Sequence, residues 1–231
     1  MFIKPENRFQ AFTIHIFISA LIFIVLAIMI TYLWYPGFLF KTDGGWDGIR
    51  LIAGIHFIIG PTLTLIVYKV GKKGLKLDLV LIGLIQFFCL GFGLWTVYQE
   101  RPIAIIYSNG EFLAKSQVLL DLYNIDSNKI FSLDTKVPAW IYIDLPENKK
   151  EKSKIIQSQL YRGPIYTYTE LYSSYKENLD KILEEAIDSS EIDPDIIQSM
   201  TENGKIYPYT ARYGSGYIEI DKNTGNFINV Y

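Results

Sequence analysis

Apolar residues dominate three stretches within the first hundred positions, residues 11–35, 49–68 and 79–98. Each stretch is about as long as the roughly 20 residues that a helix needs to cross about 30 Å of hydrocarbon. From residue 101 onward, apolar residues are interspersed with polar ones, as in an ordinary globular domain. The pattern predicts an α-helical membrane protein, with three transmembrane helices in residues 1–100 and an α+β domain in residues 101–231.

Within the second domain, period-two and β-branched patterns predict strands over residues 103–108, 111–116, 137–145, 216–221 and 226–231. Asn109-Gly110 and residues 222–225 separate the members of two predicted hairpins. Helical patterns cover residues 146–159 and 171–187, the latter with one apolar side. The sequence YGSGY at 213–217 lacks the flanking strand and helix of a phosphate loop, so we expect a turn there.

Charge gives the expected orientation and excludes one class of partner. Four lysines lie in the connector 69–78, whereas the connector 36–48 holds a single lysine. Because positive residues stay cytoplasmic, we expect a bacterial inner-membrane protein with a cytoplasmic N-terminus and a periplasmic C-terminal domain. We expect the first helix to be a retained anchor. Residues 101–231 hold 14 Lys and Arg against 19 Asp and Glu, a balance that repels nucleic acid.

Small and polar residues recur at spacings of three and four along each apolar stretch. In the third stretch they are Gln86, Cys89, Gly93 and Thr96. In the second stretch they are Ala53, His56, Gly60 and Thr64, and the first stretch has a weaker version at Thr13, Ala20, Ala27 and Thr31. Small residues allow helix backbones to approach closely in lipid. Two interpretations are open: the stripes hold the three helices together, or the third stripe receives a partner's transmembrane helix.

Two histidines and one proline add to this picture of the helices. His15 and His56 lie inside predicted spans, where a charge is penalised, and no acid lies close to them in sequence. We expect both to serve as structural hydrogen-bonding groups, although the sequence leaves their roles open. Pro61, which follows Gly60, predicts a kink that frees backbone carbonyls one turn earlier.

The second domain offers no catalytic constellation. It contains no His and no Cys, and the single cysteine of the chain, Cys89, lies in the third apolar stretch. The usual nucleophile–base pairs and thiolate metal sites are therefore excluded from it. The acidic pairs Glu184/Glu185 and Asp193/Asp195 are interpreted as a solvated face and a helix start. We expect no enzyme activity, no cofactor and no metal, although part of the set of 17 tyrosines can form a binding face.

Four strings together carry a family resemblance: RFQAFTIHIFIS from Arg8, LWYP from Leu33, GIHFIIGPTLTLIVY from Gly54 and GLWTVYQERPIAIIY from Gly93. In this order and spacing the chain resembles the type IV pilin accessory proteins of the TfpX/TfpZ type, over residues 8 to about 115. One departure is His56, where the resemblance implies an acidic residue in many members.

The resemblance implies an inner-membrane accessory or chaperone-like protein that stabilises its cognate type IV pilin or modulates pilus assembly and dynamics. A pilin awaiting assembly has a membrane helix and a periplasmic head, and two linked contacts to it would gain from effective concentration. The alternative is a membrane-anchored periplasmic sensor or signalling subunit. The cytoplasmic segments, about ten residues each, are too short for an output domain. The sequence leaves open the step of pilus biogenesis, the pilin-contacting residues and the oligomeric state.

Overall fold

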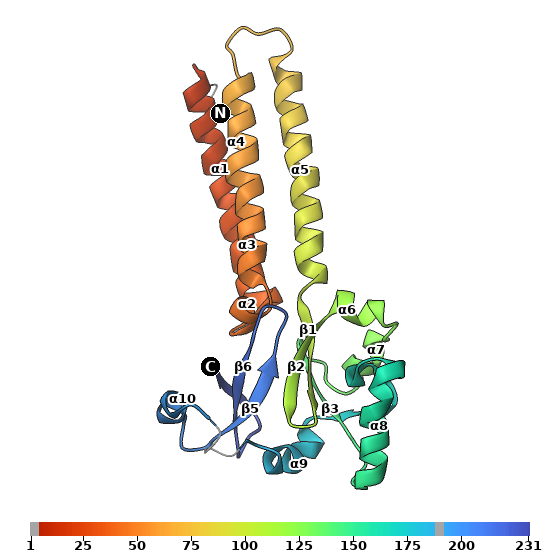
Figure 1. Cartoon of the computed structure of the whole chain (residues 1–231). Helices are drawn as coiled ribbons and strands as arrows, with labels where there is room; N and C mark the ends of the chain where they lie inside the picture. Colours follow the sequence, from red (N-terminus) through yellow and green to blue (C-terminus); the bar gives the residue numbers. More distant parts are fainter. Residues whose placement is uncertain (1–4, 188–191) are drawn as a thin grey trace. The chain divides into compact units, whose positions relative to one another are not determined.

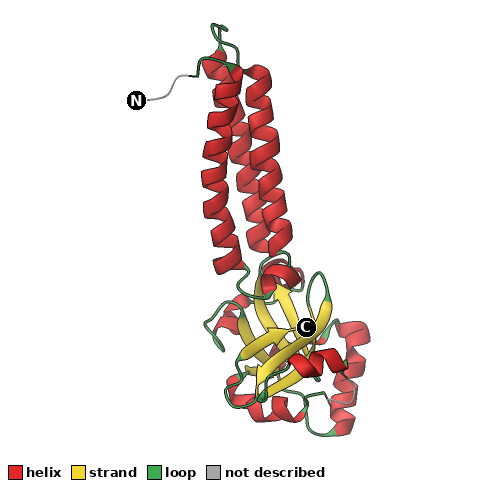
Figure 2. Ribbon diagram, turned by 90° about the vertical axis from the view of Figure 1, so that its left-hand side faces the viewer, coloured by secondary structure: helices red, strands yellow, loops and turns green. Residues whose placement is uncertain are grey.

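The computed structural model describes residues 5–187 and 192–231 and divides into two compact units, Met1–Gln99 and Glu100–Tyr231 (Figure 1). The first unit is helical, and the second combines a sheet with helices (Figure 2).

Three long apolar helices make up the first unit, which confirms that part of the predicted fold class. They run over Arg8–Trp34, Gly45–Val67 and Leu75–Gln99, and each is long and apolar enough to cross a membrane. Their segments, with a short connecting helix, are α1 Arg8–Met29, η1 Ile30–Trp34, α2 Leu39–Thr42, α3 Gly45–Ala53, η2 Gly54–Ile59, α4 Gly60–Val67 and α5 Leu75–Gln99.

The second span shows how the chain accommodates its proline. Pro61 lacks an N–H, and its ring would clash with the carbonyl oxygen four residues earlier in a regular α-helix. The π-helical segment η2 ends directly before Gly60-Pro61, and the helical span continues through them to Val67. The observed feature is thus a widened turn, and the kink at Gly60 and Pro61 stays a prediction.

A mixed sheet of seven strands forms the centre of the second unit. The strands are β1 Pro102–Ser108, β2 Glu111–Ser116, β3 Ala139–Ile143, β4 Tyr172–Ser174, β5 Gly204–Thr210, β6 Ser215–Asp221 and β7 Phe227–Val230. Their order is β4-β3-β1-β2-β5-β6-β7, with β1–β3 and β2–β5 parallel and the other neighbours antiparallel. Five strands were predicted, and β4 and β5 were not.

Helices lie around this sheet (Figure 2). They are α6 Gln117–Leu122, α7 Ser127–Phe131, α8 Lys149–Arg162, α9 Leu179–Glu184 and α10 Pro194–Ser199, with 3-10 turns at Ile165–Thr167, Thr169–Leu171 and Lys176–Asn178. The predicted helix over 146–159 is present as α8. It begins three residues later because the Asn148 side chain accepts from the N–H of Lys150 at 2.9 Å and caps it.

Strand β1 separates two parts of the core, and all seven of its residues are buried. On one face Ala104 and Ile106 belong to an aliphatic cluster completed mainly by α6, α7 and β3. On the other face Tyr107 lies 4.8 Å, centroid to centroid, from Phe112, which lies 5.6 Å from Trp140. Packing on one face is therefore mainly aliphatic, with Tyr166 and Tyr168 at its edge, and the other face carries the cluster of rings around Tyr107 and Phe112.

Both predicted hairpins are confirmed. Asn109 and Gly110 have φ of +50° and +85°, as a two-residue turn matched to the strand twist requires. In the second hairpin the Asp221 carboxylate accepts from the backbone N–H of Asn223 at 2.9 Å and of Thr224 at 2.8 Å. Gly225 follows with φ of +68°. Of the YGSGY segment only Tyr213 and Gly214 lie in the turn between β5 and β6, where Ala211 N–H donates to Gly214 O at 2.9 Å, and residues 215–217 are the start of β6.

The prediction of one amphipathic helix over residues 171–187 is wrong. Residues 172–174 form the terminal strand β4, which pairs with β3, and only Leu179–Glu184 is α-helical. The Asn178 side-chain amide donates to Ser174 O at 2.9 Å and to Ser173 Oγ at 3.0 Å, which holds the strand-to-helix corner. Pairing with a neighbouring strand thus overrides the helical periodicity of the segment.

Candidate functional site

A polar cluster joins the three spans of the first unit. His15 Nδ1 lies 2.6 Å from Thr64 Oγ1, and His15 Nε2 lies 2.8 Å from Gln86 Oε1. A carboxamide oxygen only accepts hydrogen bonds, so the tautomer that carries the proton on Nε2 satisfies both contacts, donating to Gln86 and accepting from the Thr64 hydroxyl at Nδ1. The expectation of structural hydrogen bonding is confirmed for His15, which links α1, α4 and α5. We call His15, Thr64 and Gln86 the polar lock.

Glycine at position 60 is explained by the polar lock. A Cβ on Gly60 would lie 1.7 Å from Gln86 Nε2, so only a glycine leaves room for the carboxamide beside α4. This places Gly60 in the helix interface, where small residues are expected to permit close approach.

His56 does not follow the expectation made for it. Its side chain is buried at 4% exposure, and neither ring nitrogen has a hydrogen-bond partner among residues 5–187 and 192–231. Gln86 Nε2 is likewise buried without a partner in the described part of the chain. Sequence spacing placed His56 in the inward stripe correctly but could not show whether a partner group lies within reach.

The stripe predicted on the third helix is divided by the structure. Gln86 and Gly93 are buried between helices, and a Cβ on Gly93 would lie 3.2 Å from Ile55 Cδ1. Cys89 and Thr96 are exposed, and the Thr96 hydroxyl donates to its own backbone at Phe92 O, 3.0 Å away. One half of the stripe therefore packs within the unit, and the other half lies on its surface.

Two tyrosines that the sequence reasoning missed close the ends of the helices. Tyr35 is 1% exposed and its hydroxyl donates to Val97 O at 2.9 Å, which ties the end of the first span to α5. The Tyr68 hydroxyl donates to Pro5 O at 2.7 Å. The available signal was the position of each tyrosine at the end of an apolar stretch, where an aromatic ring with a polar tip is favoured.

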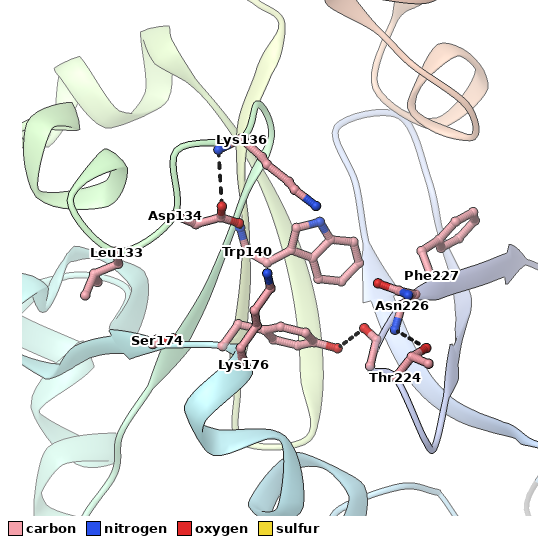
Figure 3. Close-up of a pocket in the computed structure, with 11 residues that line it drawn as sticks. Leu133, Asp134, Lys136, Trp140, Ser174, Lys176, Thr224, Asn226 and Phe227 are labelled. Atoms are coloured by element: carbon pink, nitrogen blue, oxygen red, sulfur yellow. Dashed lines mark hydrogen bonds between the residues drawn. The ribbon is translucent and has the colours of Figure 1, made fainter.

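In the second unit a cavity of about 340 Å³ lies between residues from both ends of the sheet (Figure 3). Its lining comes from three segments and consists of Leu133, Asp134, Lys136, Trp140, Ser174, Tyr175, Lys176, Thr224, Gly225, Asn226 and Phe227. Residues 133–140 lead into β3, residues 174–176 follow β4, and residues 224–227 form the turn into β7. The sequence reasoning missed this site because its segments are far apart along the chain.

Comparison with known proteins gives the family. The chain is 33% identical over 112 residues, 47% of its length, to fimbrial assembly proteins of Dichelobacter nodosus from serogroups C1 and C2, serogroup E1 and serogroup I. The match covers 86% of the protein from serogroups C1 and C2. The chain belongs to the family of fimbrial assembly proteins.

The match covers 44% of the E1 and I proteins, so the chain spans less than half the length of those two relatives. No family model matches the chain, and no solved structure matches it.

Several titratable groups of the C-terminal unit make internal contacts. The Tyr107 hydroxyl donates to Glu185 Oε2 at 2.9 Å, and burial, followed by the Glu185 charge, raises the pKa of that phenol well above its usual range. Lys152 lies 3.6 Å from the same carboxylate, so Glu185 is not simply a solvated acid. Asp193 accepts from Asp195 N–H at 2.9 Å at the start of α10, as predicted. Among residues 5–187 and 192–231, no three His, Cys, Asp or Glu side chains form a metal-binding group.

Proposed function

We propose that this fimbrial assembly protein is an inner-membrane accessory protein of type IV pilus biogenesis that binds and stabilises its cognate pilin or modulates pilus assembly and dynamics. The observation that carries the proposal is the similarity to fimbrial assembly proteins over 112 residues. In this proposal the protein acts by binding, without catalysis, cofactor or nucleic acid.

The arrangement of the helices supports different roles for two sets of residues on α5, one buried and one exposed. Gln86 and Gly93 pack inside the unit, so they are occupied by intramolecular contacts. Cys89 and Thr96 border large exposed apolar side chains of the same helix, among them Phe88 and Phe92 at 68% and 74% exposure. Such a surface suits lipid or another apolar helix. In this proposal a pilin helix packs against the side of α5 that carries Cys89 and Thr96. Gln86 and Gly93 are not part of that contact.

A strain that lacks the gene tests the function. The gene is deleted and supplied again as wild type, and surface pili are counted for the cognate pilin and for an unrelated pilin. We expect the deletion to lose cognate pili and the wild-type copy to restore them. Equal piliation in the deleted and complemented strains contradicts the proposed function. An equal loss for both pilins contradicts the cognate specificity.

Two matched variants test the proposed helix surface. Thr96→Leu adds bulk on the Cys89 side of α5, whereas Gly91→Leu adds it at an exposed position, with no atom within 4 Å of the added Cβ, on a different side of the helix. We expect Thr96→Leu, at normal protein level, to reduce both pilus number and pilin crosslinking from Cys89, and Gly91→Leu to retain them. Loss in both variants, or in neither, contradicts the assignment of this surface.

The proposed topology places the inner membrane around the three spans and the C-terminal unit in the periplasm. The basis is the lysine-rich connector 69–78, since positive residues favour the cytoplasmic side. A periplasm-dependent reporter should be active when fused after Tyr231 and silent when fused after Lys73. The opposite pattern would reverse the compartment of the C-terminal unit.

A further inference from the structure

We infer that the cavity between the ends of the sheet is a binding site for an acidic peptide segment that carries an aromatic or aliphatic side chain beside its carboxylate. We call it the sheet-end pocket; its residues are those drawn in Figure 3. Its volume of about 340 Å³ falls in the range of cavities that hold small ligands or a few residues of a peptide. The inference is independent of the proposed function, because binding is measured with peptides alone.

Aromatic rings form the apolar part of the sheet-end pocket. Trp140 and Tyr175 pack with centroids 5.2 Å apart, and Phe227 lines the pocket from β7. Trp140 also packs on Phe112 in the core, so its indole is held in place from behind. A fixed aromatic surface of this kind binds an apolar or aromatic side chain at little cost in conformational entropy.

Two lysines give the pocket its charge. The side chains of Lys136 and Lys176 extend toward Trp140 in Figure 3. The one lining carboxylate, Asp134, is engaged by the loop itself: it accepts from Lys136 N–H at 3.1 Å and from Trp140 N–H at 3.0 Å. With two lysines against this one aspartate, the lining carries a net charge of +1, although acids outnumber bases 19 to 14 in residues 101–231. Ammonium groups beside an aromatic surface complement a carboxylate next to an apolar group.

The position of the pocket favours a peptide over a compact small molecule. It is bounded by segments next to β4 and β7, the two terminal strands of the sheet. The Tyr175 hydroxyl donates to Gly225 O at 2.9 Å and so fixes the spacing between these segments. Terminal strands are where extended peptides add to sheets, with side-chain pockets giving specificity. An extended segment can thus place one side chain on Trp140 while its backbone follows a terminal strand.

The test uses the full chain in detergent with fluorotryptophan at its four tryptophans, of which Trp140 alone lies in residues 101–231. The Trp140 resonance is assigned by its absence in Trp140→Phe. The probe is the capped pentapeptide Gly-Asp-Phe-Asp-Gly, compared with Gly-Asn-Phe-Asn-Gly, with Gly-Asp-Gly-Asp-Gly and with the small molecule 3-phenylpropionate. We expect the first peptide to shift the Trp140 resonance in a saturable manner. The affinity of each of the three other ligands should be at least about tenfold lower.

Paired lysine variants locate the charge. The double variant Lys136→Gln with Lys176→Gln should lower the affinity for the Asp-Phe-Asp peptide by about tenfold or more. Lys149→Gln with Lys150→Gln removes the same charge from exposed positions on α8 that do not line the pocket, and should leave binding unchanged. Both doubles are compared at equal thermal stability, and calorimetry gives a second measure of binding.

Three results would overturn the inference. They are no saturable shift at Trp140, equal binding of the Asp and Asn peptides, and equal weakening by the two double variants. Binding of 3-phenylpropionate as tight as that of the peptide would assign the pocket to small aromatic acids and contradict a peptide occupant. Loss of pili in the double variant is not required, so the outcome is separable from that of the proposed function.

Discussion

The two units differ in how many residues they bury and in which side chains are buried. Strand β1 buries all seven of its residues, whereas the 25-residue helix α5 buries four, Ile82, Gln86, Gly93 and Val97. The core of the C-terminal unit is built from aliphatic and aromatic side chains, and two of the four buried positions in α5 are an amide and a glycine. Within the most apolar part of each span, 33% of the residues are buried in the second span, compared with 11% in the first and 17% in the third.

The difference reflects the solvent in which each unit is proposed to fold. In water, removing apolar surface drives packing at roughly 25 cal/mol per Å². In lipid that drive is absent, so close approach and hydrogen bonds between helices take its place. In the first unit the polar lock and the glycine beside it add to a small apolar cluster around Ile30, Ile52 and Val97, whereas Ile106 and its neighbours form a larger apolar core in the second. The following variants test that comparison, from the largest expected effect to the smallest.

Ile106→Ala should destabilise the C-terminal unit by about 2–5 kcal/mol, because it removes a fully buried side chain and leaves a cavity. The same change at Ile85, which is 49% exposed on α5, should stay within about 0.5 kcal/mol. Denaturant unfolding of the fluorotryptophan-labelled full chain, followed at the Trp140 resonance for the first variant and by loss of helical circular dichroism for the second, measures both. Similar costs at the two positions would break the contrast between the units.

Gly60→Ala should destabilise the helical unit by about 1–2 kcal/mol, because the new Cβ displaces the Gln86 amide and its bond to His15. Removing the amide should relieve the clash, so Gly60→Ala combined with Gln86→Ala should cost less than the sum of the single variants. Unfolding of the chain in detergent, followed by circular dichroism, gives the three values. Strict additivity would show that the polar lock does not pack against Gly60.

Gly110→Val should destabilise the C-terminal unit by roughly 1 kcal/mol or more, because a β-branched residue resists the φ of +85° found there. Gly110→Asn, whose side chain tolerates that conformation, is the control and should cost clearly less. Thermal melting of the full chain followed at Trp140 compares the two. An equal loss would indicate that the side chain, and not the backbone, matters at this turn.

Asp221 should produce a small loss of stability in acid. The N–H groups of Thr224 and Asn223 donate to its carboxylate and lower its pKa below the usual 3.8. A depressed pKa stabilises the folded state above the unfolded pKa, and this contribution disappears as the pH falls from about 3.8 through the lower folded value. Asp221→Asn should remove that part of the pH dependence of the unfolding midpoint, whereas Glu177→Gln should keep it. An unchanged pH profile in Asp221→Asn would exclude this turn as its source.

Local patterns were sufficient for much of the fold. The three apolar stretches and the two hairpins were predictable because hydrophobic length and positive-φ turn residues act within a few positions of the chain. Asp193 was predictable at a helix start for the same reason. The segment 171–187 was not, since its strand exists only through pairing with β3.

The sequence by itself determined that this protein has three membrane-length helices and an acidic α+β domain, and it placed Gly60, Thr64 and Gln86 on helix stripes and His15 inside the first span. Only the tertiary structure decided that His15 meets Thr64 and Gln86, 49 and 71 positions away, and that Cys89 and Thr96 stay on the surface. The sheet-end pocket likewise exists only where its three distant segments come together. The physical reason is that periodicity gives the face of an element on which a side chain lies. The side chain on the facing element depends on how the two are rotated and shifted against each other, and packing of the whole unit sets that.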